Sequence, residues 1–420
     1  MQLTRFSKIR RGCAAILTVF PGRANGRGPS QPRRSGAGAG RRGARMAGAC
    51  ALGLTMLASA PAQAPQRFIV TAYIFPRGRS LSAGEIDAGA VSRINYAFAT
   101  VQDGRVGGVS AADAQNLAML TGLRARNPSL AVLISVGGWL GSGGFSDAAL
   151  TAQSRSEFAA SAVELLRRYD LDGLDVDWEY PGLPGAGHAF RAEDAQNFTS
   201  LIEELRRRFD REKRPNGRRW LLTIAAGASD EYLSHVEMSE VQGYLDGVNL
   251  MAYDYTMPSG HGATGHNAPL FAEPGAPSRD AVDGSVRSFE RAGVPARKIL
   301  LGAALYGHAW GDVADRNHGL FQPGRSAGKD SVPYSAIEQE MLGHGFTRYW
   351  DEAASVPYLY NAGTREFVAY DDAESLGVKS DYVKAQQLGG MMLWEYLDDP
   401  SGALLHAIDR ALMPARGAGP

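Results

Sequence analysis

Short apolar runs rich in Val, Ile and Leu recur eight times from Arg67 onward, with helix-like patterns between them. The runs occupy residues 68–75, 93–101, 130–138, 171–180, 220–228, 245–254, 299–307 and 389–396. The clearest helix pattern is Ser156–Tyr169, where an apolar stripe lies beside charged residues. Eight successive β–α units predict an α/β fold, a (β/α)8 TIM barrel. A doubly wound open sheet is the alternative, but no Gly-rich phosphate-binding sequence follows any run, which disfavours it.

One spacing departs from this repeat. Residues 308–388, between the seventh and eighth runs, exceed what one loop and one helix need. The segment 311–369 predicts a small α+β module inserted between strand 7 and strand 8. We therefore expect one barrel domain over residues 65–410, with the module inside it, and a tail over 411–420.

Residues 1–64 do not resemble part of this fold. They contain 11 Lys and Arg residues, no Asp or Glu, an apolar run from Met46 to Leu57, and small residues that match A-x-A cleavage sites. This pattern predicts a basic leader and a secretory signal peptide that is removed, so we expect a secreted or periplasmic protein. The apolar run is too short to span a bilayer, and Cys50 lacks a Leu three residues before it, so no membrane anchor is expected.

The charge balance argues against an anionic partner. The 44 basic and 44 acidic residues cancel overall, but without residues 1–64 the chain keeps 33 basic and 44 acidic residues. An acidic domain does not favour nucleic acid or an anionic membrane as a partner. Both cysteines, Cys13 and Cys50, fall in the leader, so the mature protein would contain no disulfide. We expect a monomer.

Carboxylates crowd into "LDGLDVDWEYPG", residues 171–182. On a β-strand, side chains two residues apart point the same way, so Asp175, Asp177 and Glu179 would share one face. The apolar residues between them would then face the surrounding helices. This spacing predicts several carboxyl groups that converge inside the barrel.

Two other readings of this stretch remain. An acidic run is more often a solvated face than a site, but burying carboxyl groups together without a function is costly in repulsion and desolvation. A Mg²⁺ or Ca²⁺ site is the second alternative. Trp178 and Tyr180 supply aromatic surface that suits a sugar better than a hydrated ion. Glu179 lies where the strand ends, at the face on which barrel active sites are found.

Six motifs in order carry a resemblance to a known family. "DGLDVDWEYP" resembles the D-x-x-D-x-D-x-E sequence of glycoside hydrolase family 18, the chitinases and their relatives. "LISVGGW" resembles the family's S-x-G-G, "LMAYDY" its M-x-Y-D, and "TGHNAPLF" the loop after that strand. "LGAALYG" and "GGMMLWEY" are similar to its last two strands. The resemblance spans about Arg67 to Asp409 and implies a catalytic barrel that needs no cofactor and no metal.

The resemblance also implies roles for individual residues. In this family the 2-acetamido oxygen of the substrate is the nucleophile, an exception to the two-carboxylate scheme. By position, Glu179 would protonate the leaving oxygen and then activate water. Asp177 would bind the acetamido N–H, and Asp175 would share a proton with Asp177 as a coupled pair. Tyr253 would position the acetamido oxygen, and Trp394 would lie under the reacting sugar.

Other positions match cleft residues of the family. Tyr73 and Ser135 match residues that hydrogen-bond the deeper aspartate. Three further matches line the cleft: Met251, Asp254 and Tyr306. Three tryptophans are either sugar platforms or packing residues: Trp139, Trp310 and Trp350. Of these, Trp139 is assigned to substrate binding.

Some residues are given a structural interpretation instead. Asp172 starts its strand and is interpreted as structural. The eight histidines show no metal-ligand spacing, so His261 and His266 are interpreted as hydrogen-bonding loop residues.

The chain departs from the family pattern at two points. His308 follows Tyr306-Gly307 where relatives often have an arginine, so the resemblance implies no sugar contact by arginine here. The loop "TMPSGHGATG" lacks a tryptophan that many relatives place near the leaving-group sugars.

The sequence thus predicts an exported enzyme that cleaves β-1,4 N-acetylglucosamine linkages of chitin or chitooligosaccharides. The implied mechanism is retaining and substrate-assisted. An endo-β-N-acetylglucosaminidase acting on glycans is one alternative, which the inserted module disfavours because a deep cleft suits a linear chain. A non-catalytic chitin-binding lectin is the other, and the presence of Glu179, Asp177 and Tyr253 argues against it.

Overall fold

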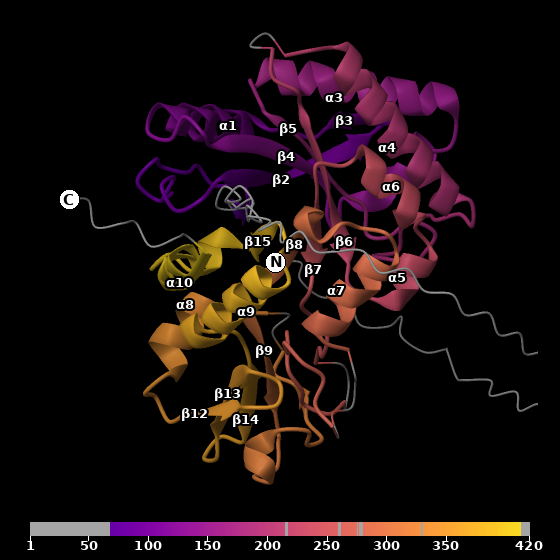
Figure 1. The fold of residues 1–420 in the computed structure, drawn as a ribbon. Helices are drawn as coiled ribbons and strands as arrows, with labels where there is room; N and C mark the ends of the chain where they lie inside the picture. Colours follow the sequence, from indigo (N-terminus) through magenta and orange to yellow (C-terminus); the bar gives the residue numbers. More distant parts are fainter. Residues whose placement is uncertain are drawn as a thin grey trace, which may run out of the picture. The chain divides into compact units, whose positions relative to one another are not determined.

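The computed structural model describes residues 68–214, 217–258, 262–274, 276, 280–328 and 331–412. The predicted leader over residues 1–64, with both cysteines, lies outside these ranges, as do His261 and residues 413–420 of the predicted tail. No helix within the described ranges is long and apolar enough to cross a membrane. Figure 1 labels most of the elements named below.

Eight parallel strands form a closed barrel. They are β1 (Ile69–Ile74), β2 (Arg93–Gln102), β4 (Ala131–Gly137), β5 (Gly173–Asp177), β6 (Leu221–Gly227), β7 (Gly247–Met251), β8 (Ile299–Ala304) and β15 (Gly390–Trp394). The strands pair in the order β1-β15-β8-β7-β6-β5-β4-β2, and the pairing of β1 with β2 closes the ring. The short β3 (Arg105–Gly107) adds antiparallel to β2. The predicted (β/α)8 barrel is confirmed.

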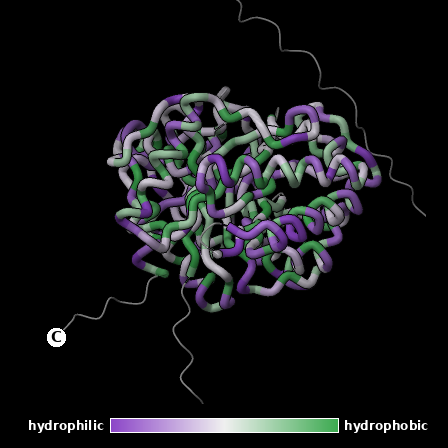
Figure 2. The backbone as a smooth tube through the Cα atoms, turned by 90° about the horizontal axis from the view of Figure 1, so that it is seen from above, coloured by the Kyte–Doolittle hydropathy of each residue, from purple (hydrophilic) through white to green (hydrophobic). Residues whose placement is uncertain are grey.

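Helices cover the outside of the barrel. They are α1 (Ala111–Gly122), α2 (Phe145–Ala148), α3 (Ala152–Arg168), α4 (Asp194–Arg211), α5 (Asp230–Ser234), α6 (Met238–Tyr244), α7 (Val282–Arg291), α9 (Ala373–Ala385) and α10 (Ala403–Leu412). Helix α3 begins four residues before the predicted start, because Thr151 and Ser154 form a capping box there. Figure 2 shows that hydrophilic stretches lie mainly along the outer helices.

Alternation along β5 separates the core from the site. Leu174 and Val176 point outward into the layer between strands and helices and are fully buried. Trp178 continues this face and lies 5.3 Å from Phe145 and 5.9 Å from Phe198 between ring centroids. Burial of one such apolar side chain contributes about 1.5–3 kcal/mol. The inward positions of β5 are thereby left to carboxylates.

A second sheet lies between β8 and β15, as predicted for the insertion. Its strands are β9 (Tyr306–Gly311), β10 (Arg325–Ser326), β11 (Val332–Pro333), β12 (Thr347–Asp351), β13 (Val356–Asn361) and β14 (Glu366–Ala369), with the short helix α8 (Tyr334–Ala336). The antiparallel order is β10-β9-β14-β13-β12, with β11 paired to β9. In Figure 1 this sheet, orange to yellow, lies beyond β8 and α9, away from α3 and α4. The sheet begins at Tyr306, ahead of the 311–369 range.

The insertion sheet has its own apolar core. Trp310 is fully buried there, among Tyr358, Tyr360 and Phe367. Of the two interpretations of Trp310, packing is therefore the one that holds. A side chain with no exposed surface cannot act as a sugar platform.

Asp172 anchors the start of β5. Its two carboxylate oxygens lie 2.5 Å from Nη2 of Arg124 and 2.5 Å from Nη1 of Arg214. One oxygen also accepts the backbone N–H of Val132 at 2.8 Å. The structural interpretation of Asp172 therefore holds, and β5 is fixed at the end opposite to its carboxylate-rich terminus.

Candidate active site

Strand register brings polar side chains from several strands to Asp175. Ser135 on β4, Asp175 on β5 and Thr223 on β6 are direct neighbours across the barrel wall. Because equivalent positions of paired strands point to the same face, all three side chains enter the barrel interior. The interior at this level is polar, whereas the outer face is apolar.

Asp175 accepts hydrogen bonds from four side chains. Oδ2 accepts the hydroxyls of Tyr73 at 2.7 Å and Ser135 at 2.8 Å. Oδ1 accepts Thr223 Oγ1 at 2.5 Å and Asn249 Nδ2 at 3.0 Å. Burial raises the pKa of Asp175, while these donors act in the opposite direction. The donors hold the side chain in place and favour its ionised form.

Asp177 lies in a contrasting environment. Its side chain is buried, and Oδ1 has no hydrogen-bond partner among the described protein atoms. Burial and the nearby charges of Glu179 and Asp175 raise the pKa of Asp177 well above its usual value. Four hydrogen-bond donors stabilise a negative charge on Asp175, and Asp177 Oδ1 has none in the described chain. We therefore infer that the proton shared by Asp175 and Asp177 resides on Asp177 in the free protein. The unpartnered oxygen is available to a ligand donor.

Glu179 lies beyond the strand rather than at its end. The expected strand over 171–180 is too long: β5 ends at Asp177, where its pairing with β4 ends. The backbone N–H of Glu179 donates to Ser142 Oγ at 2.9 Å, and that hydroxyl donates to the carbonyls of Gly138 and Asp177. Ser142 therefore fixes the turn that presents Glu179.

The electrostatics of Glu179 suit a general acid. Burial and the charge of Asp254 raise its pKa to about 7, partly offset by a hydrogen bond from Tyr180. A general acid is most effective when its pKa lies near the working pH. The Glu179 carboxyl is thus protonated at neutral pH to a useful extent.

This pKa predicts the alkaline limb of the pH–rate profile. Because a general acid must carry a proton, kcat/KM for a reaction that uses Glu179 in this role should fall as pH rises through about 7, its pKa before substrate binds. Asp254→Asn removes a charge that raises this pKa, so the limb should move to lower pH. Initial rates across the neutral range measure both effects. A profile flat across that range would contradict the assignment of Glu179.

Tyr253 and Asp254 follow β7, which is separated from β5 by β6 alone. Burial raises the pKa of Tyr253 well above its usual value, and nearby negative charges add to this effect. The charges are those of Asp254, Asp177, Glu179 and Asp175. The Tyr253 hydroxyl therefore keeps its proton. The backbone of Asp254 is left-handed, with φ of 62°. Its side-chain oxygen Oδ1 accepts a hydrogen bond from the Tyr306 hydroxyl at 2.6 Å and lies 2.8 Å from His308 Nε2. Its backbone N–H donates to Asn267 Oδ1 at 3.0 Å. His308 therefore lies against Asp254, and its side chain is buried.

Trp394 forms part of an aromatic floor. The centroid of its ring lies 5.8 Å from that of Tyr73, 6.2 Å from that of Phe75 in a stacked orientation, and 5.6 Å from that of Phe98. Met251 packs against the same small cluster, together with Tyr253. The indole is only partly buried, so part of its apolar surface remains available to a ligand.

Trp139 lies outside this floor. It follows β4, is 49% exposed, and contacts Tyr180 at 6.3 Å between ring centroids. Leu140 beside it is 84% exposed. Exposed aromatic and apolar surface next to the Glu179 turn is compatible with a sugar platform. Trp350 is half-buried under the guanidinium of Arg348, at 5.4 Å.

Three residues of the site escaped the sequence reasoning: Thr223, Asn249 and Ser142. A usable signal existed for Thr223 and Asn249, since each is a polar residue flanked by apolar residues in the middle of its run and alternation places it inward. Ser142 gave no such signal because its contact with Glu179 depends on how the loop after β4 folds. Within the described ranges, the carboxylates of β5 do not belong to a group with metal-ligand spacing.

Comparison with known proteins agrees with this geometry. The profile of "Glycosyl hydrolases family 18" matches residues 70–399. Chitinase A1 of Niallia circulans is 39% identical over 322 residues, which cover 73% of this chain and 46% of that protein. Chitinase B of Serratia marcescens is 32% identical over 353 residues, covering 69% of each chain. The chain thus spans about half the length of the first relative.

Solved structures give the same result. A glycoside hydrolase family 18 N-acetylglucosaminidase from Paenibacillus barengoltzii superposes with a TM-score of 0.75 at 42% identity, covering 82% of this chain and all (100%) of that one. Chitinase ChiW from a Paenibacillus strain superposes with a TM-score of 0.78 at 37% identity, covering 82% of this chain and 33% of that one. The chain therefore belongs to glycosyl hydrolases family 18, as a glycosidase of the chitinase type.

Proposed function

We propose that the protein is an exported chitinase that hydrolyses β-1,4 linkages between N-acetylglucosamine units by a retaining, substrate-assisted mechanism. The observation that carries this proposal is the contrast between two adjacent carboxyls. Asp175 is surrounded by four donors, whereas Asp177 keeps a buried oxygen without a partner. An acetamido N–H is a donor that this oxygen can accept.

The first step uses Glu179 as the acid. Glu179 gives its proton to the glycosidic oxygen, whose bond to the anomeric carbon breaks, while the acetamido oxygen of the same sugar bonds to that carbon. Tyr253, protonated because of its raised pKa, can hydrogen-bond and orient this oxygen. Passage of the shared proton to Asp175 leaves a negative charge on Asp177, which stabilises the oxazolinium ion.

The second step returns the site to its starting state. The Glu179 carboxylate takes a proton from a water molecule that attacks the anomeric carbon from the side the leaving group vacated, while the bond from that carbon to the acetamido oxygen breaks and restores the acetamido group. Two inversions at one carbon retain the β configuration. Trp394 lies below the reacting sugar in this proposal, where its indole face covers the C–H surface of the pyranose.

A second candidate differs in the length of product released. The Paenibacillus barengoltzii relative, similar along its whole length, is described as an N-acetylglucosaminidase. Release of single N-acetylglucosamine units is therefore the competing activity for this chain. The product ladder from chitin oligomers of defined length separates it from chitinase action, and a glycoprotein substrate tests for endo-β-N-acetylglucosaminidase action.

The mechanism predicts the anomer of the first product. If the acetamido oxygen is the nucleophile, fresh product should be the β-anomer, as proton NMR within the first minutes can show before mutarotation. Fully deacetylated chitosan should not be cleaved, since it lacks the nucleophile, and a thiazoline analogue of the intermediate should inhibit. Initial release of the α-anomer would mean direct attack by water and would reject the mechanism.

The remaining parts of the proposal concern the setting of the enzyme. The Arg-rich leader with its short apolar run supports export to the periplasm or medium. The acidic balance of residues 65–420 argues against nucleic acid as a partner. We propose a monomer that needs no membrane anchor.

A further inference from the structure

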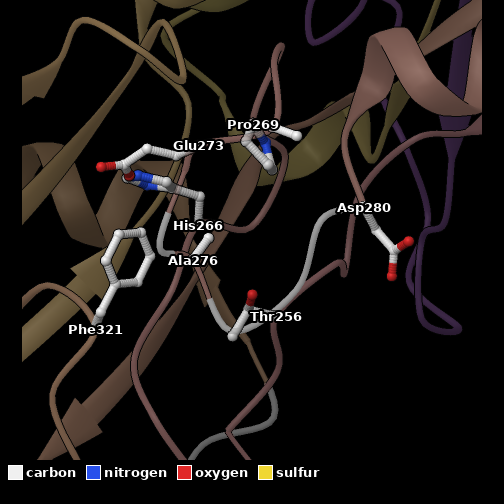
Figure 3. Close-up of a pocket in the computed structure, with 8 residues that line it drawn as sticks. Thr256, His266, Pro269, Glu273, Ala276, Asp280 and Phe321 are labelled. Carbon is white, nitrogen blue, oxygen red and sulfur yellow. The ribbon is translucent and has the colours of Figure 1, made fainter.

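A second group of ionisable side chains lies away from the carboxylates of β5. His266 and Glu273 belong to the segment between β7 and α7, and Asp351 is the last residue of β12 in the insertion sheet. One donor atom from each residue lies within 4.8 Å of the other two. Figure 3 shows the His266 ring beside the Glu273 carboxylate, in a small cavity that Thr256 and Phe321 also line.

The group contains polar atoms that the described protein leaves without hydrogen bonds. His266 Nε2 lies 2.7 Å from Asp351 Oδ2, as expected of a hydrogen-bonding loop residue. Its other nitrogen, Nδ1, is buried without a partner, although the residue is only 4% exposed. Glu273 Oε2 is also buried without a partner. A buried polar atom without a partner calls for an explanation, and a bound ion is one that would satisfy the Glu273 oxygen.

The two carboxylates lie close enough to repel each other. Asp351 Oδ1 accepts the backbone N–H groups of Ala353 at 3.0 Å and Ala354 at 3.1 Å, which leaves Oδ2 directed at the group. A cation between the carboxylates would remove the repulsion, and hydrogen bonds behind a ligand are typical of metal sites.

We propose that His266, Glu273 and Asp351 form a binding site for one divalent metal ion of the zinc class. One imidazole nitrogen and two carboxylate oxygens make a mixed donor set that suits Zn²⁺, whereas Mg²⁺ and Ca²⁺ favour oxygen donors alone. Bonds from the metal to such ligands are about 2.0–2.2 Å. Donor atoms on one such ion lie at most about 4.4 Å apart, close to the 4.8 Å within which these three atoms lie.

The ion would join two parts of the fold rather than take part in hydrolysis. Hydrogen bonds already connect the β7–α7 segment to the insertion sheet, from Leu270 N to Ala354 O at 2.9 Å and from Thr264 N to Gln322 O at 2.9 Å. The metal would add a stronger connection at the same seam. Its expected effect is on stability, because a ligand that binds the folded state alone shifts the folding equilibrium.

The test is a titration of ZnCl₂ into the full chain after treatment with a chelator and buffer exchange. Calorimetry should show one ion bound per chain, and Tm should rise by several degrees at a Zn²⁺ concentration about 100 times Kd, where folding is favoured about 100-fold more. Glu273→Gln keeps size and removes the charged ligand, so it should weaken Zn²⁺ binding more than tenfold. His344→Ala, an exposed histidine of the insertion, is the matched control and should bind as the native chain does.

The outcomes separate clearly. Absence of binding to the native chain, or equal affinity in Glu273→Gln, would overturn the site, as would loss of binding in the His344→Ala control. Tighter binding of CaCl₂ or MgCl₂ than of ZnCl₂ would overturn the zinc-class assignment. His266→Ala removes a buried side chain and can impair folding, so Glu273→Gln, whose residue is only partly buried, decides the question.

Discussion

Glu179→Gln is expected to lower kcat on chitooligosaccharides by at least about 10²–10⁴-fold, the usual contribution of a general acid–base group. Glutamine keeps the size of the side chain and its place beside Tyr180 but has no proton to donate to the leaving oxygen. Substrate affinity should therefore persist while turnover is lost. Steady-state rates and binding calorimetry on the same oligomer measure the two quantities separately.

A matched control isolates the chemistry. Glu193→Gln makes the same substitution in the connection between β5 and α4, at an exposed residue, and should leave both quantities unchanged. An aryl glycoside, whose leaving group needs little protonation, should show a smaller loss in the bond-breaking step of Glu179→Gln than an oligomer does. Retention of more than about a tenth of the native rate on oligomers would exclude Glu179 as the acid.

Asp177→Asn is the second large effect, a loss of about 10²–10³-fold in kcat, as for removal of one group that stabilises developing charge. Asparagine cannot carry the negative charge that balances the oxazolinium ion. Since this charge develops whatever the leaving group is, the loss should be similar for oligomers and for the aryl glycoside. The two variants thus differ in their dependence on the leaving group.

Stability provides an independent check on Asp177→Asn. The native side chain is buried beside two other carboxyls, and their charges oppose its ionisation. Removing that conflict should leave Tm unchanged or raise it, although turnover falls. A marked drop in Tm would mean that Asp177 serves the fold, and the loss of activity would then not report on catalysis.

The barrel could be predicted from the sequence because each strand is a compact apolar run and each helix keeps its own period. Alternation within β5 also separated Asp175 and Asp177 from Leu174 and Val176 correctly. The predicted end of β5 was wrong because the length of a strand depends on where its pairing with β4 and β6 stops. The local sequence pattern does not encode that point.

Other features depend on contacts between distant segments. Ser142 reaches the Glu179 turn, and Asn267 reaches Asp254, through loops whose paths no periodicity specifies. The group of His266, Glu273 and Asp351 combines a barrel loop with an inserted strand. Spacing rules for metal ligands work within one segment, so they could not detect it.

The ion pairs of Asp172 have a consequence for engineering this protein. Asp172 and Asp177 lie five residues apart on one extended strand, roughly 16 Å at about 3.3 Å per residue. Substitutions separated by more than about 7–10 Å, without shared partners, usually have additive effects on stability. A library directed at the turn after β5 to alter substrate preference therefore need not be screened together with stabilising changes around Arg124 and Arg214. Variants from the two searches should combine without mutual penalty.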